Sequence, residues 1–264
     1  SNTSAKIEVF YIGGSSIVNH ALKTNTETIN IEMTADATVA IGANEAKYYF
    51  GGADTKVINI VGNDKVLTFN HTNGDWNYIR CNNEEAKWNI KNVKLTNSGK
   101  NNGPWNRHDI RFYNDVTLEN ATSDKAIALL ADGDLTNVVI SDVHPENGEA
   151  YALWITAEGQ TVNLTNCQLL AHESKKTDRG IKIDNQYVDA EAKVTLNVDG
   201  LKVKSQKKAA IMVKSTAGAD ITLSNIDITG VAEDSSNEVW VDEDAAKYVD
   251  KVNVVGGSMI VEGQ

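Results

Sequence analysis

Aromatic and charged residues recur in short segments in which apolar and polar residues alternate. Three of these segments carry a Trp or a Lys at the polar position: "ALWI" (152–155), "GIKI" (180–183) and "EVWV" (238–241). If each segment is a strand, Trp154, Lys182 and Trp240 point away from their apolar neighbours, because successive side chains face opposite sides. Aromatic rings beside charged groups suit sugars, which stack on rings and hydrogen-bond to polar side chains. The pattern predicts a carbohydrate-binding surface.

Related segments extend this surface along the chain. Taken segment by segment, the outward residues form two columns, one of Arg80, Arg111, Ala128, Trp154, Lys182, Met212 and Trp240, and one of Asn82, Tyr113, Leu130, Thr156, Asp184, Lys214 and Asp242. The residues predicted to contact carbohydrate are Trp154, Trp240, Lys182, Asp184, Arg111 and Tyr113. The alternative is that loops cover the two Trp rings, or that Lys182 and Met212 pack between them.

Two carboxylates in the second column raise the question of catalysis. Asp184 and Asp242 are two segments apart, which corresponds to about 9.6 Å at the spacing of neighbouring strands. This separation is close to the upper limit for the acid and base of an inverting glycosidase. Lys214 lies between them, however, so an ion-pair ladder is the simpler interpretation.

The histidines and cysteines do not indicate a metal or a nucleophile. His108, His144 and His172 fall in different repeats and lack the fixed spacing of metal ligands. We therefore predict no metal site and no cofactor. Cys81 and Cys167 are about three repeats apart, or roughly 14 Å along the stacking axis. A disulfide requires Cα atoms within about 7 Å, so both cysteines are predicted to be buried free thiols.

A repeated pattern in the sequence would align the outward residues into these columns. Segments such as "ITLSNIDITG" (221–230) share a turn residue between apolar positions, and the turn residues are Asn92, Asn120, Asp142, Asn166, Gly200 and Asn225, with Gly62 and Gly256 as weaker outer members. Asn and Gly tolerate the left-handed backbone angles of a sharp turn. An irregular repeat of this kind, with two strands and no helix in each unit, is typical of a solenoid.

The alternation also predicts the core. The inward residues of the short segments are Ile79, Ile110, Phe112, Ile127, Leu129, Leu153, Ile155, Ile181, Ile183, Ile211, Val213, Val239 and Val241. The residues expected opposite them are Trp88, Ile90, Leu118, Ile140, Leu164, Val198, Leu223 and Val254.

Because of these repeats, residues 56–256 resemble the right-handed parallel β-helix proteins of the pectin-lyase-like superfamily. The resemblance implies an all-β, single-stranded solenoid of about seven to nine coils. Similarity to the polysaccharide lyases of this superfamily would imply an enzyme with Arg111, Lys182 and Asp184 in the active site and calcium as the cofactor. Hydrolases of similar fold carry an Arg-Ile-Lys element, which "DRGIKI" (178–183) matches only loosely, and their other motifs are missing.

The whole chain of 264 residues is predicted to form a single domain. Residues 1–55 are expected to form an N-terminal cap and the first coil, residues 56–256 the regular coils, and residues 257–264 a tail. Within the cap, "SSIVNHALKTN" (15–25) places Ile17, Val18, Ala21 and Leu22 on one face of a short helix, with Ser15 or Ser16 as its N-cap.

Composition and charge reduce the number of functions that fit this sequence. A net charge of −11 argues against nucleic-acid binding, which requires a basic face. No apolar run approaches the roughly 20 residues that span a bilayer. We expect a secreted or cell-surface bacterial monomer that binds a polysaccharide or another glycan without catalysis. A polysaccharide lyase or glycoside hydrolase acting on acidic polysaccharide is the alternative, and a structural or adhesin scaffold is the second alternative.

Overall fold

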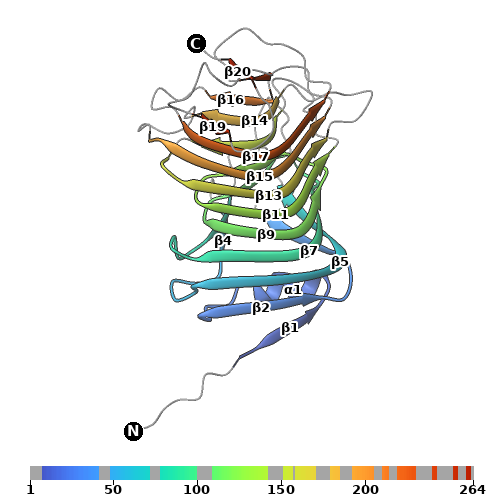
Figure 1. Cartoon of the computed structure of the whole chain (residues 1–264). Helices are drawn as coiled ribbons and strands as arrows, with labels where there is room; N and C mark the ends of the chain where they lie inside the picture. The colour runs from blue at the N-terminus through green and yellow to red at the C-terminus, as the bar shows by residue number, and fades with distance from the viewer. Residues whose placement is uncertain are drawn as a thin grey trace.

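The computed structural model describes residues 8–41, 48–71, 78–99, 109–141, 151–156, 158–170, 179–184, 192–204, 210–213, 219–229, 240–242, 252–254 and 260–262. Two sheets of parallel strands make up most of this part of the chain (Figure 1). The first sheet contains β1 (Phe10–Gly13), β2 (Thr28–Met33), β3 (Ala37–Ile41), β5 (Val57–His71), β7 (Lys87–Asn97), β9 (Asp115–Ser123), β11 (Gly133–Ser141), β13 (Thr161–Leu170), β15 (Val194–Lys204), β17 (Ala219–Thr229) and β19 (Val252–Val254).

The second sheet consists of shorter strands. It contains β4 (Tyr48–Phe50), β6 (Ile79–Cys81), β8 (Ile110–Phe112), β10 (Ile127–Leu129), β12 (Tyr151–Thr156), β14 (Arg179–Asp184) and β16 (Ile211–Val213). Two further strands, β18 (Trp240–Asp242) and β20 (Ile260–Glu262), form an antiparallel pair. From β4 to β17 the chain alternates between the two sheets, so each strand pairs with a strand one repeat away. This all-β arrangement is consistent with a parallel β-helix-like fold.

Left-handed residues bend the long strands of the first sheet. Asn92, Asn120, Asn166 and Asn225 have φ angles of 49° to 53°, and Gly200 has a φ of 86°. The turn positions predicted at these five residues are therefore confirmed. A left-handed backbone favours Asn and Gly, because other side chains clash with the following carbonyl.

The turn predicted at Asp142 falls on a residue outside the described part of the chain, just after β11. Asn137 is the left-handed residue of that strand, with a φ of 52°, and its Nδ2 donates to Asn120 Oδ1 at 3.0 Å. The two Asn residues are only 17 positions apart, because β9, β10 and β11 follow one another closely. In β5 the left-handed residues are Asn63 and Asp64, directly after the predicted Gly62, and Gly256 lies outside the described residues.

The predicted core is confirmed wherever its side chains are described. These side chains are all at most 3% exposed: Ile79, Ile110, Phe112, Ile127, Leu129, Leu153, Ile155, Ile181, Ile183, Ile211, Trp88, Ile90, Leu118, Ile140, Leu164, Val198 and Leu223. The side chains of Val213, Val239, Val241 and Val254 lie outside the described part. Cys81 and Cys167 are free and buried, as predicted.

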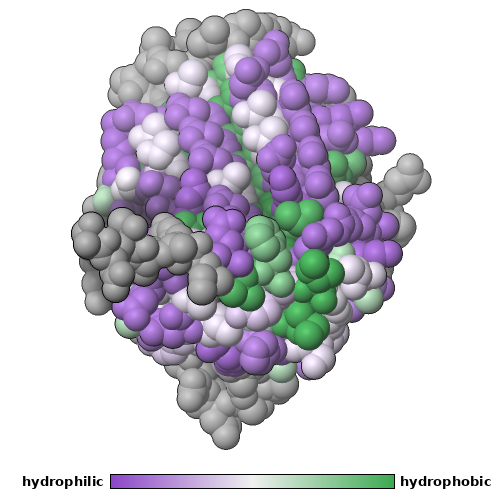
Figure 2. Space-filling view, turned by 90° about the horizontal axis from the view of Figure 1, so that it is seen from below, coloured by the Kyte–Doolittle hydropathy of each residue, from purple (hydrophilic) through white to green (hydrophobic). Residues whose placement is uncertain are grey.

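A short helix, α1 (Ser15–Ala21), lies at the N-terminal end of the sheets (Figure 1). Val18, Ala21 and Leu22 are buried in the core, as predicted, but Ile17 is 38% exposed. The N-cap residue is Gly14 and no side chain caps the helix, so the predicted Ser cap is wrong. Parallel pairing already begins at β1, which pairs with β2. Hydrophobic side chains gather at this end of the molecule (Figure 2).

Candidate functional site

The outward face of the second sheet holds most of the predicted site residues. Strand pairing places Arg111 beside Ala128, Ala128 beside Trp154, Trp154 beside Lys182, and Lys182 beside Met212. This part of the first predicted column is confirmed. β18, which carries Trp240, pairs with β20 instead of β16, so strand pairing does not continue the column to Trp240. The side chains of Trp240, Asp184, Lys214 and Asp242 lie outside the described part.

The register between β6 and β8 differs from the prediction. Ile79 pairs with Phe112, which places Arg80 beside Tyr113 instead of beside Arg111. Tyr49 of β4 pairs with Arg80 on its other side. The alternation of apolar residues cannot reveal this shift, because a displacement by two residues keeps every side chain on its predicted face.

Arg111, Trp154 and Lys182 are buried. Their exposed fractions are 0%, 3% and 4%, so the expected exposure of the Trp154 ring is wrong. The Arg111 guanidinium lies 5.4 Å from the Trp154 ring centre, and the Lys182 ammonium lies 5.3 Å from the ring centre of Tyr151. Tyr151 and Trp154 contact each other at 5.7 Å between ring centres. We call Arg111, Tyr151, Trp154 and Lys182 the buried cation–aromatic layer.

A carboxylate balances part of the charge in this layer. Asp109 is 5% exposed, and its Oδ2 lies 3.3 Å from Arg111 Nη2 and accepts a hydrogen bond from the Tyr151 hydroxyl at 3.1 Å. A buried guanidinium requires such a partner, because an uncompensated buried charge is strongly unfavourable. Arg111 is therefore held as a structural group in the conformation described.

Further toward the N-terminal end, the same face carries a partly exposed group. The Arg80 guanidinium lies 3.9 Å from the ring centre of Tyr113 and 5.1 Å from that of Tyr49. Tyr78 contacts Tyr113 at 5.8 Å between ring centres. Tyr49 is 39% exposed, and Tyr78 and Tyr113 are partly exposed. We call Tyr49, Tyr78, Arg80 and Tyr113 the tyrosine–arginine cluster.

Arg80 combines a buried cation with an exposed partner. Its side chain is 5% exposed and forms an ion pair with Glu84, whose side chain is 64% exposed. Two of its guanidinium nitrogens, Nε and Nη1, are buried and have no hydrogen-bond partner among the described residues. A buried donor without a partner is costly, and the contacts of the guanidinium with the two Tyr rings and with Glu84 offset part of this cost.

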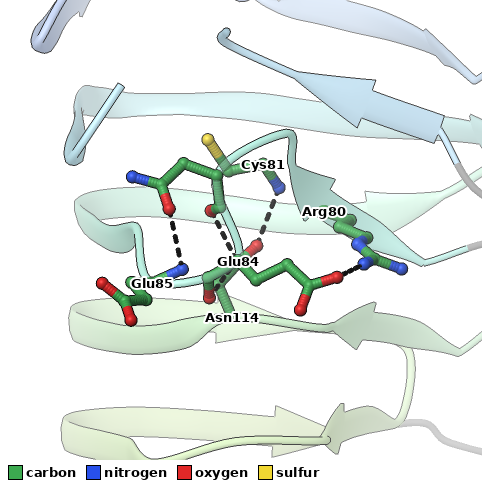
Figure 3. Close-up of polar contacts among 6 residues, drawn as sticks. Arg80, Cys81, Glu84, Glu85 and Asn114 are labelled. Atoms are coloured by element: carbon green, nitrogen blue, oxygen red, sulfur yellow. Dashed lines mark hydrogen bonds and ion pairs between the residues drawn. The ribbon is translucent and has the colours of Figure 1, made fainter. Parts of the chain in front are cut away.

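Asn114 fixes the turn that carries Glu84 (Figure 3). Its Oδ1 accepts from Cys81 N at 2.7 Å and from Trp88 Nε1 at 3.3 Å. Its Nδ2 donates to the carbonyl oxygens of Asn83 at 3.3 Å and Glu84 at 3.0 Å. Asn114 is 1% exposed, so its amide is a buried clamp that presents Glu84 to Arg80.

Desolvation shapes the protonation of the neighbouring groups. Burial raises the pKa of Tyr78, which the Arg111 charge partly opposes and the Glu158 charge increases. Burial also raises the pKa of Glu158. The pKa values of Cys81 and Cys167 are raised by burial as well, so both thiols stay protonated at neutral pH and are poor nucleophiles.

A surface cavity of about 340 Å³ lies on the first sheet, over β5, β7 and β9. Its lining includes Asn59 and Asn89, whose amides bond each other: Asn89 Nδ2 donates to Asn59 Oδ1, and Asn59 Nδ2 donates to Asn30 Oδ1, each at 3.0 Å. The amides therefore form a ladder along the sheet, and the lining has no aromatic ring for a sugar to stack on. The tyrosine–arginine cluster is the stronger candidate.

Comparisons with known proteins give no match to a family model, a curated protein or a solved structure. In the described part of the chain, no three His, Cys, Asp or Glu residues come together as a metal site would require. No described helix has the length and apolarity to cross a membrane. The three histidines considered above as metal ligands, His108, His144 and His172, lie outside the described residues.

Sequence reasoning missed Tyr49, Tyr78 and Glu84. The segment "YYF" (48–50) shows the same alternation as the later short strands, so extending the repeat by one unit would have found Tyr49. Tyr78 directly precedes β6, and the alternation of that segment would have placed it on the outward face. Glu84 lies in a turn, where no alternation marks it.

Proposed function

We propose that this protein is a secreted or cell-surface bacterial protein that binds carbohydrate without catalysis. We further propose that its fold is a right-handed parallel β-helix of the pectin-lyase-like type with about seven to nine coils, which the two sheets of parallel strands support. The binding surface is the outward face of the second sheet, centred on the tyrosine–arginine cluster. The site lies within one chain, so binding requires no second copy.

The observation that carries this proposal is the arrangement of Tyr49, Arg80 and Tyr113 in neighbouring strands. The Tyr rings lie on either side of the guanidinium, and Tyr49 keeps more than a third of its surface exposed. β4 is the last strand of the second sheet in the described structure, so the Tyr49 ring is free of a strand neighbour on one side. A sugar ring can stack there while its hydroxyls bond the exposed Glu84 carboxylate.

Burial of Arg111, Trp154 and Lys182 supports a structural role for these residues, in strands of the same sheet farther from its β4 edge. An enzyme of the lyase class would need Arg111 and Lys182 in contact with the substrate carboxylate, together with Asp184 and a bound calcium ion. Exposed fractions of 0% and 4% give the two cations no such contact in this conformation. The geometry therefore favours binding over catalysis.

A glycan array tests the proposal. The wild-type chain and Tyr49→Ala are compared, with Tyr49→Phe as the matched control because it keeps the ring and loses only the hydroxyl. We expect binding to a defined glycan that Tyr49→Ala abolishes and Tyr49→Phe retains. Absence of binding to neutral and acidic glycans, or equal binding by all three proteins, would contradict the proposal. Release of unsaturated products from an acidic polysaccharide with calcium would favour the lyase instead.

A further inference from the structure

The first sheet ends at its N-terminal side in two strands with different neighbours. β1 pairs only with β2 among the described residues, and β3 pairs with the second half of β5. The outer edge of a terminal strand exposes backbone N–H and C=O groups that can pair with another chain. Folded proteins usually cover such edges.

Helix α1 covers the edge of β3. Ser15 Oγ accepts a hydrogen bond from Thr38 N at 2.9 Å. Asn19 Nδ2 donates to the Thr38 carbonyl oxygen at 2.7 Å, and Asn19 Oδ1 accepts from Ala40 N at 3.2 Å. Polar side chains of the helix thus take the place of a neighbouring strand, and β3 is protected from pairing.

The edge of β1 has no strand neighbour in the described part of the chain, and it is apolar. Phe10 is 60% exposed and Ile12 is 56% exposed, and both occupy outward positions of β1. Val9 and Ile17 beside them are 42% and 38% exposed. The segment from residue 9 to residue 22 contains no Asp, Glu, Lys or Arg. Seen from this end, several hydrophobic side chains lie at the surface (Figure 2).

We infer that the outer edge of β1 pairs with β1 of a second copy of this chain. A two-fold contact brings identical residues together, so like charges near the axis would repel each other in a chain with a net charge of −11, and an uncharged strand avoids this cost. β1 is such a strand. A two-fold axis at the edge makes the paired strands antiparallel, joins the first sheets of the two copies and lets Phe10 and Ile12 pack across the axis. The dimer replaces the expected monomer and is independent of the proposed glycan site.

Light scattering and sedimentation test this interface. The wild-type protein is expected to have twice the 28.7 kDa mass of one chain, with reversible dissociation on dilution. The double variant Phe10→Lys/Ile12→Lys should raise the dissociation constant at least about tenfold, because lysines on an edge strand oppose pairing. The control is Tyr49→Lys, which charges another exposed hydrophobic residue, on the second sheet, and should leave the dimer intact.

Hydrogen exchange provides a measurement that needs no variant. The amides of Phe10–Gly13 should become more protected as the concentration of wild-type protein rises, while those of β3 should not change. A wild-type chain that stays monomeric, equal dissociation by Tyr49→Lys, or growth into open-ended oligomers would each overturn the inference.

Discussion

Two halves of one sheet face carry the same kinds of residues and differ in exposure. In the buried cation–aromatic layer, Arg111 and Trp154 are almost completely inaccessible, and Asp109 balances the guanidinium. In the tyrosine–arginine cluster, Arg80 contacts Tyr49 and Tyr113, and its carboxylate partner Glu84 faces solvent. A cation beside an aromatic ring is therefore not by itself a binding site, because its surroundings decide whether the pair stabilises the fold or meets a ligand.

The largest expected effect compares the two aromatic positions. Trp154→Ala should lower the free energy of unfolding by about 3–5 kcal/mol, because it removes a large buried side chain and leaves a cavity. Tyr49→Ala should lower it by only about 0.5 kcal/mol, as for most surface substitutions. Urea unfolding measures both values. Equal losses of unfolding free energy in the two variants would contradict the difference in burial between Trp154 and Tyr49.

The next comparison concerns the two arginines. Arg111→Met should destabilise the protein by about 3 kcal/mol, because Asp109 would remain buried without its cation. Arg80→Met should cost about 1 kcal/mol, since Glu84 can be hydrated when its partner is removed. Both substitutions keep much of the side-chain length, so packing changes little. A larger cost for Arg80→Met, measured by the same unfolding assay, would reverse the comparison.

Asn114→Ala tests how strongly the turn that carries Glu84 is held in place. The substitution leaves the buried Cys81 N and Trp88 Nε1 donors without an acceptor, and should cost about 2–3 kcal/mol. The turn that presents Glu84 would also lose its clamp, so glycan affinity should fall in the fraction that remains folded. Asn83→Ala serves as a control, because among the described residues its side chain accepts only the Glu85 N–H. Unchanged stability in Asn114→Ala would mean that backbone pairing alone holds the turn.

The smallest expected effect is a pH dependence near Tyr78. The raised pKa of Glu158 means that the folded state binds its proton more readily than the unfolded chain does. This contribution to stability is complete below the ordinary pKa of 4.5 and is lost as the pH rises through the raised value. Glu158→Gln should therefore gain stability relative to wild type as the pH rises above about 4.5. Glu158 is an exposed residue, so the gain should be small, and a loss over this range would contradict the assigned direction.

The sequence by itself determined which side chains face the core. Alternation of apolar residues in segments such as "DIRF" and "GIKI" placed Ile110, Phe112, Ile181 and Ile183 inside, and all four are buried. Asn at the turns was predictable for a local reason, since left-handed backbone angles select Asn and Gly wherever they occur. The free thiols followed from the distance between repeats.

Tertiary structure alone decided the composition of the candidate site. The two-residue shift between β6 and β8 moved Arg80 from Arg111 to Tyr113, although every side chain stayed on its predicted face. The burial of Trp154 and the open edge of β1 likewise depend on what lies beside them in space. The physical reason is that alternation is a property of one strand, whereas register and exposure are properties of the strands and segments packed against it.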